Sequence, residues 1–222
     1  MNVRFGLCVV LSMLLGFFTF GFSGSAAAED MSWKHEGTAP EGRMTVGFRA
    51  GLSLLTQEVV DGTDSSVGPA LNFQAMYGVN KWINIGAMLT WERHSVDLER
   101  PKADLASVNT VTLLPLYAEF RPGHFGKLQP YVGTGIGVNI NSTSEADAFK
   151  RQNITLSPGN TFAWRVAGGL DYALTQHFLL NTEFAVNRNR GTLETKQGST
   201  VTDRSAFDAS SMNILFGVKY IF

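Results

Sequence analysis

Apolar and polar residues alternate in eight segments of the chain, and this alternation limits the fold more than any other feature of the sequence. A repeat of two residues is typical of a β-strand whose two faces lie in different surroundings. Several segments reach the roughly 9–11 residues that a tilted strand needs to cross a bilayer. We therefore predict an all-β fold with strands at 44–54, 68–78, 82–93, 109–120, 129–140, 161–172, 178–188 and 210–222.

The connections between these segments alternate in length. The sequences VNK, RPGHFGKL and ALTQH form short turns, whereas the connections between them are long and polar. Short turns at one end and long loops at the other are typical of outer-membrane barrels, where the short turns face the periplasm. No apolar run after residue 30 is as long as a transmembrane helix, so a mature chain in a membrane would cross it as strands. We predict an eight-stranded antiparallel transmembrane β-barrel, an up-and-down meander, over residues 44–222.

The N-terminus has the order of a secretory signal. Asn2 and Arg4 precede an apolar run over residues 5–22, and SGSAAAED follows it. We predict a signal peptide at 1–28 and a periplasmic tail at 29–43; the alternative is a retained membrane anchor. The chain's one cysteine, Cys8, lies in the signal, so the exported protein would contain no disulfide.

The two faces of the predicted strands differ in composition. Residues expected to face outward are Val46, Phe48, Leu52, Leu71, Phe73, Tyr77, Ile83, Ile85, Leu89, Trp91, Val132, Ile136, Val138, Trp164, Val166, Leu170, Tyr172, Phe178, Leu180, Phe184 and Val186. A soluble β-sandwich would bury the same face, so alternation alone does not choose between the two folds. Aromatic residues gather near the short turns, as an interfacial girdle requires, and this favours the membrane barrel.

The opposite face carries charged residues, which we expect to point into the barrel. An eight-stranded barrel has a lumen just wide enough to be filled by side chains. Charges removed from water must be paired or hydrogen-bonded. We predict an ion-pair network that plugs the lumen, with a proton or ion path as the alternative, formed by Arg49, Glu92, Glu119, Arg165, Asp171, Glu183 and Lys219.

The stretch YVGTGIGV places glycine at every second position, which differs from a phosphate-binding loop because no helix is expected after it. We expect Gly133, Gly135 and Gly137 to make room for a bulky lumen neighbour such as Tyr117. Pro115 lies inside a predicted strand, although proline cannot donate to a β-ladder. It therefore predicts a bulge or a local gap in the wall.

The sequence offers little for catalysis or for cofactors. Its four histidines, His35, His94, His124 and His177, do not have the spacing of a metal site. His94 precedes Ser95, but adjacent residues of a strand point to opposite faces. We predict no enzyme activity, no metal and no cofactor, and a net charge of −1 argues against nucleic acid as a partner.

The stretches LLPLYAEFRPGHFGKLQPYVGTGIGVNI (113–140) and GGLDYALTQHFLLNTEF (168–184) resemble the OmpW family of small outer-membrane β-barrels. That resemblance implies location in the bacterial outer membrane among lipid and lipopolysaccharide. It also implies a C-terminal signal, including Tyr220 and Phe222, that is read by the outer-membrane assembly machinery. It further implies a narrow channel or carrier for small hydrophobic molecules with a lateral opening, lined here by Met76, Met88, Leu113, Pro115 and Tyr117. The alternatives are a structural or adhesive barrel with a plugged lumen and ligand-binding loops, and a lipid A-modifying enzyme.

Overall fold

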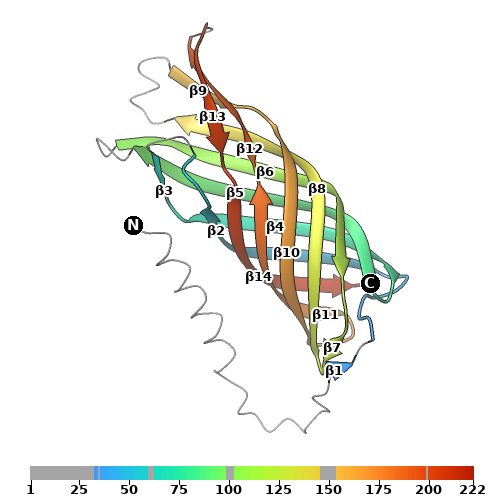
Figure 1. Cartoon of the computed structure of the whole chain (residues 1–222). Helices are drawn as coiled ribbons and strands as arrows, with labels where there is room; N and C mark the ends of the chain where they lie inside the picture. Colours follow the sequence, from blue (N-terminus) through green and yellow to red (C-terminus); the bar gives the residue numbers. More distant parts are fainter. Residues whose placement is uncertain (1–32, 35, 60–62, 99–102, 146–153, 199) are drawn as a thin grey trace. The chain divides into compact units, whose positions relative to one another are not determined.

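The computed structural model describes residues 33–34, 36–59, 63–98, 103–145, 154–198 and 200–222 (Figure 1). The expected signal peptide and residues 29–32 of the expected tail lie outside these ranges. No helix in the described part of the chain is long and apolar enough to cross a membrane. Residues 33–222 form one compact unit.

Eight long antiparallel strands form a closed barrel, as the sequence predicts (Figure 1). Each strand pairs with the next long strand along the chain, and β14 returns to pair with β2, as in the pair Tyr220 and Val46. In chain order the strands are β2 (Met44–Leu55), β4 (Gly68–Asn80), β5 (Ile83–Leu98), β6 (Ala103–Phe120), β8 (Leu128–Glu145), β10 (Thr161–Ala173), β11 (Phe178–Arg188) and β14 (Ser211–Ile221).

Six shorter strands lie outside this barrel wall. At the short-turn end, β1 (Trp33–Lys34) pairs with β7 (His124–Phe125), and in the first long loop β3 (Thr63–Ser65) pairs with β5. The other long loops contain a separate sheet of β9 (Ile154–Pro158), β12 (Arg190–Gln197) and β13 (Thr200–Asp208). The sequence did not predict this sheet, because β12 and β13 are mostly polar and the alternation of Ile154 and Leu156 with polar residues in β9 is very short. Gly198, with φ of 63°, lies between β12 and β13, where a left-handed residue suits a tight hairpin.

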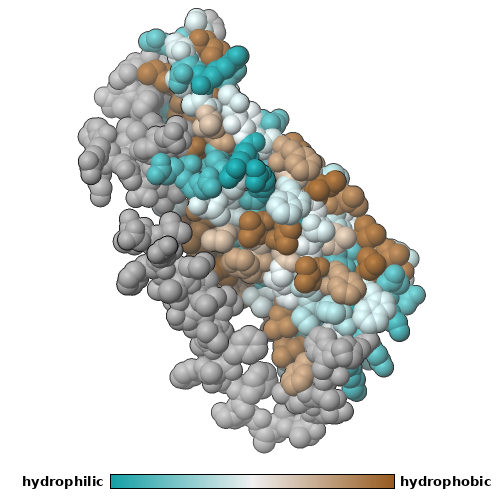
Figure 2. Space-filling model, viewed as in Figure 1, coloured by the Kyte–Doolittle hydropathy of each residue, from teal (hydrophilic) through white to brown (hydrophobic). Residues whose placement is uncertain are grey.

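The predicted faces of the barrel strands are confirmed. Every residue predicted to face outward is exposed or half-buried, and Phe48, Phe73 and Phe216 are each about half exposed. Every charged residue predicted to face inward is buried. Figure 2 shows apolar side chains along the visible part of the wall and polar side chains toward its two ends.

Strand β6 contains a bulge at the predicted proline. Leu113 is opposite Val138 of β8, but Leu116 is opposite Ile136, so β6 has one more residue than its neighbour. The pairing with β5 shifts at the same place. Pro115 is exposed on the outer face, and Leu113 is 41% exposed. The prediction that Leu113 faces the lumen is therefore wrong, because the extra residue reverses the alternation on the N-terminal side of the bulge, whereas Pro115 lies at the bulge that was predicted for it.

Candidate functional site

The described part of the barrel interior holds four cationic and four anionic side chains, each at most 2% exposed. They come from β2, β5, β6, β10, β11, β14 and the turn after β6. Alternation brings them inside, because every second residue of a barrel strand faces the lumen. The cations are Arg49, Arg121, Arg165 and Lys219, and the anions are Glu92, Glu119, Asp171 and Glu183.

Four of these charges form a cluster near the short-turn end. The Nη2 atom of Arg121 lies 2.7 Å from a carboxylate oxygen of Glu119 and 2.7 Å from one of Asp171. The ammonium of Lys219 lies 3.2 Å from an oxygen of each of these carboxylates. It also lies 4.1 Å from the centre of the Tyr131 ring, which is within cation–π range. Two cations and two anions thus neutralise one another, and we call this group the lower cluster.

A second group is centred on Glu183 of β11. Its carboxylate accepts from Arg49 and, at 2.6 Å, from Arg165, so two guanidinium groups share one anion. The Tyr131 hydroxyl donates to the same carboxylate at 2.8 Å. Arg49 also donates to Asn72 at 3.0 Å, so the guanidinium is held from both sides. These directional contacts fix the side chains in place, because charge-assisted hydrogen bonds are short and strong.

Glu92 is held mainly by neutral donors. Four side chains donate to its carboxylate, at 2.7 Å from Ser211, 2.8 Å from Asn187, 3.0 Å from Ser53 and 3.1 Å from Asn213. Arg165 donates in turn to the amide oxygens of Asn187 and Asn213, which connects Glu92 to a cation through two amides. The nearest histidine atom, Nε2 of His94, is 3.8 Å away.

The structure brings all seven predicted charged residues into this network and adds Arg121, which the sequence analysis missed. Arg121 follows the last residue of β6, where the predicted strand ended. Two signals could have found it. The first is its position two residues after Glu119, which places it on the same face of an extended chain. The second is that the predicted interior had three cations against four anions, an imbalance that one further cation removes.

An apolar cluster lies inside the wall beside the β6 bulge. It contains Met76, Met88, Leu114, Tyr117 and Ala163, all at most 1% exposed. Three of the five residues predicted to form the hydrophobic route belong to it, and Leu114 occupies the place that the prediction gave to Leu113.

The tyrosine of this cluster rests on the glycines of β8. A Cβ on Gly133 would overlap the Tyr117 hydroxyl, and one on Gly135 would lie 2.8 Å from its Cδ2 atom. The prediction that the glycines of this stretch make room for Tyr117 is therefore confirmed for Gly133 and Gly135. A Cβ on Gly137 would instead overlap the carbonyl oxygen of Leu113, so this glycine allows close approach of the backbone at the bulge.

A second apolar cluster lies at the long-loop end. It joins residues of β5 and β6 to the loop sheet, and its buried members are Val59, Val96, Val108, Leu193, Phe207 and Ala209. Between the two apolar clusters is a neutral layer in which Thr110 donates to Asn141 at 2.9 Å and Thr112 donates to Asn139 at 2.8 Å. A solute moving between the clusters would meet amides and hydroxyls at this level.

His94 and Ser95 lie on opposite faces of β5, as predicted. His94 is 2% exposed, whereas Ser95 is exposed. The Nδ1 atom of His94 lies 3.3 Å from the Ser66 carbonyl oxygen. Within the described ranges, no three histidine, cysteine or acidic side chains are grouped so that they could hold a metal ion. His35 lies outside those ranges.

Residues of the predicted aromatic girdle form two groups at the short-turn end of the wall. Tyr220 contacts Phe178 and Phe222 edge to face, with ring centroids 4.9 and 4.8 Å apart. Next to the turn between β4 and β5, the Trp82 ring stacks on the Phe120 ring, with ring centroids 6.3 Å apart. Aromatic side chains of this kind are enriched where a barrel meets the two interfaces of a bilayer.

Comparison with known proteins agrees with this geometry. The family model described as the outer membrane protein beta-barrel domain matches residues 17–222. Among solved structures, the outer membrane protein OprG from Pseudomonas aeruginosa is 18% identical with a TM-score of 0.65, and the match covers 82% of this chain and 96% of OprG. No curated protein sequence matches the chain.

Two further structures share the fold. The outer membrane protein AlkL, determined in lipid bilayers, is 17% identical with a TM-score of 0.53, over 90% of this chain and 97% of AlkL. Neisserial surface protein A is 15% identical with a TM-score of 0.51, over 82% of this chain and 98% of that protein. These matches confirm the predicted likeness to small eight-stranded barrels.

Proposed function

The chain belongs to the outer membrane protein beta-barrel domain family and lies in the bacterial outer membrane, and from this premise we propose that it carries small hydrophobic molecules sideways through its wall into the bilayer. The observation that carries the proposal is the apolar cluster of Met76, Met88, Leu114, Tyr117 and Ala163 directly behind the β6 bulge. We do not propose transport along the barrel axis, which is the route that a simple channel would use.

The charged network argues against passage along the axis. The lower cluster and the Glu183 group fill the interior with buried ion pairs at 2.6–3.2 Å. Breaking a buried pair by removing one partner costs about 3–5 kcal/mol. A hydrophobic solute cannot replace the lost contacts, so it has no favourable path toward the periplasm through this region.

The wall at the bulge is apolar on both sides. Leu113, Leu116 and Ile136 are exposed on the outer face, and Leu114 and Met88 lie on the inner face. The pairing of β6 is interrupted here toward both neighbours, and Pro115 has no N–H to donate. Methionine has three flexible side-chain bonds and adapts to irregular apolar partners. At the bulge an apolar solute meets an interrupted ladder and apolar side chains on both faces of the wall.

Deletion of Pro115 tests the route. Without this residue, Leu114 and Leu116 become neighbours, the pairing with β5 and β8 becomes regular, and every other side chain of β6 keeps its face. Cells that produce the wild-type chain should take up radiolabelled octane faster than cells without it. The deletion should reduce uptake to the level of cells without the protein, while the restored ladder raises the free energy of unfolding by about 1 kcal/mol.

The matched control is Pro115→Ala, which keeps the extra residue and therefore the bulge. It should retain octane uptake. Planar-bilayer recordings of the purified wild-type chain should show no discrete channels, because the ion pairs close the axis. Octane uptake that survives the deletion would refute the route at the bulge, and steady unitary currents would refute a closed axis.

A second candidate function is a surface-binding barrel with a plugged lumen. The loop sheet favours it, because the β12–β13 hairpin carries a charge cluster in which the exposed Arg204 and the half-buried Lys196 lie 2.9 and 3.4 Å from Glu194. If wild-type cells show no octane uptake, this candidate replaces the carrier. Removal of the hairpin should then abolish attachment of the cells to a surface or matrix while the barrel remains folded.

A further inference from the structure

The residues just before the first barrel strand are bonded to the turn between β4 and β5. The Ala39 N–H donates to the Lys81 carbonyl at 2.9 Å, and the Gly42 N–H donates to the Gly78 carbonyl at 2.8 Å. The Gly78 N–H donates back to the Arg43 carbonyl at 3.0 Å. Ala39 is only 7% exposed. We call residues 36–43 the strap.

The strap lies within the mouth of the barrel and not beside it. Gly78 occupies an inward position of β4, and a Cβ there would overlap the carbonyl oxygen of Pro40. The strap itself fits closely at Gly37, where a Cβ would overlap the Lys81 carbonyl and lie 3.0 Å from a ring carbon of Trp82. Both glycines are therefore places where only a bare backbone fits.

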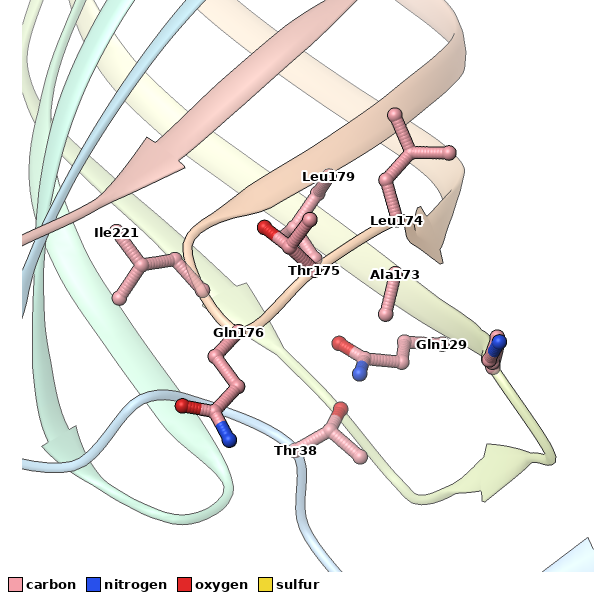
Figure 3. Close-up of a pocket in the computed structure, with 9 residues that line it drawn as sticks. Thr38, Gln129, Ala173, Leu174, Thr175, Gln176, Leu179 and Ile221 are labelled. Carbon is pink, nitrogen blue, oxygen red and sulfur yellow. The ribbon is translucent and has the colours of Figure 1, made fainter.

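The strap also faces the opposite wall. Thr38 lines a pocket of about 410 Å³ at the mouth, together with Gln129 at the base of β8, Leu179 of β11 and Ile221 of β14 (Figure 3). Leu179 and Ile221 are buried residues of the lumen face. The strap thus contacts the β4–β5 side of the barrel mouth. At Thr38 it also borders the pocket that lies between the strap and strands β8, β11 and β14.

We propose that the strap is a periplasmic closure that keeps water away from the lower cluster. Asn84, opposite Gly78 in the ladder, is also opposite Glu119, and the Arg121 N–H donates to the Trp82 carbonyl at 2.8 Å. The residues that anchor the strap are therefore direct neighbours of the ion pairs. Excluding water lowers the local dielectric constant and strengthens those pairs.

A thiol introduced beneath the strap reports on this closure. Asn84→Cys places it at a side chain that is 1% exposed and opposite Gly78. Ala185→Cys, in a fully buried position of β11, is the control reporter. The full chain with Cys8→Ser contains no other thiol. The rate of modification by a small cationic methanethiosulfonate reagent is measured on the folded protein in detergent, with folding verified by heat-dependent migration on a gel.

Two variants open the strap and one serves as their control. Gly37→Val introduces the overlap with Lys81, and Ala39→Asp places a charge at a buried strap position. Glu36→Val adds the same valine one residue earlier, at an exposed position. Loss of about one net hydrogen bond corresponds to roughly a tenfold change in the closed-to-open ratio.

We expect each opening variant to raise the modification rate of the Asn84→Cys reporter by about tenfold or more. Glu36→Val should leave this rate unchanged, and the Ala185→Cys reporter should stay slow in every background. The proposal fails if the Asn84→Cys thiol is modified at the same rate in the wild-type background and in a folded barrel with either opening substitution.

Discussion

Arg121→Gln should be among the most destabilising single substitutions in the barrel. The Arg121 side chain is 2% exposed and lies 2.7 Å from both Glu119 and Asp171. Its removal leaves two buried carboxylates with Lys219 as their one remaining cation in the lower cluster. Removing one partner of a buried pair costs about 3–5 kcal/mol, and Arg121 serves two pairs, so we expect a loss at the upper part of this range.

The assay is urea unfolding of the barrel in lipid vesicles, followed by tryptophan fluorescence. Arg93→Gln is the matched control, because Arg93 is exposed on the outer face of β5, and its effect should stay within about 0.5 kcal/mol. The double variant Arg121→Gln with Glu119→Gln removes one charge of each sign and leaves Lys219 paired with Asp171. It should be more stable than the sum of the single effects predicts, by about 1–3 kcal/mol. A loss below about 1 kcal/mol for Arg121→Gln, or strict additivity, would refute the view that charge balance holds this cluster together.

Two further predictions concern the glycines of the wall and the loop hairpin. Gly133→Val should lower the free energy of unfolding by about 1–3 kcal/mol because its side chain overlaps Tyr117, whereas Gly168→Val, whose Cβ meets open space, should be nearly neutral in the same urea assay. The hydrogen bond from Arg204 keeps the pKa of the half-buried Glu194 carboxyl below its ordinary value. This contact therefore stabilises the hairpin fully at a pH above the ordinary pKa, and the stabilisation is lost as the pH falls through the lowered pKa. Carboxyl titration by NMR should show the lowered pKa in the wild type and a rise toward the ordinary value in Arg204→Ala.

The sequence predicted the barrel well because strand alternation maps directly onto its two faces. All eight long strands were found, and their inward and outward residues were assigned correctly wherever the ladder is regular. Strands β5, β6 and β8 run further toward the long loops than predicted. The extension of β8 in residues 141–145 contains only polar residues, so no apolar period marks it as strand. The loop sheet was missed because β12 and β13 are mostly polar and β9 is only five residues long.

The interior network was predicted less completely, because it depends on contacts between strands that are distant in the sequence. Arg121 donates to Asp171 across 50 residues, and its position two residues after Glu119 indicates an inward side chain but not this partner. The alternation of residues identified which charges face inward. It could not show that Glu92 accepts hydrogen bonds from serine and asparagine side chains while Glu183 forms ion pairs with two arginines. Those assignments follow from barrel closure and from the stagger of the strands.

The error at Leu113 shows how closely the wall and the interior depend on each other. With Pro115 left out, β6 reads as an unbroken alternation in which Thr110, Thr112 and Leu114 share the face of Tyr117. The structure has this arrangement, and Thr110 and Thr112 donate inward to asparagines of β8. A strand without the bulge that kept Pro115 would instead turn both threonines toward the lipid and Leu113 into the lumen. The chain therefore tolerates an extra proline only as a bulge, and the weak point in the wall follows from the need to keep the polar interior layer bonded.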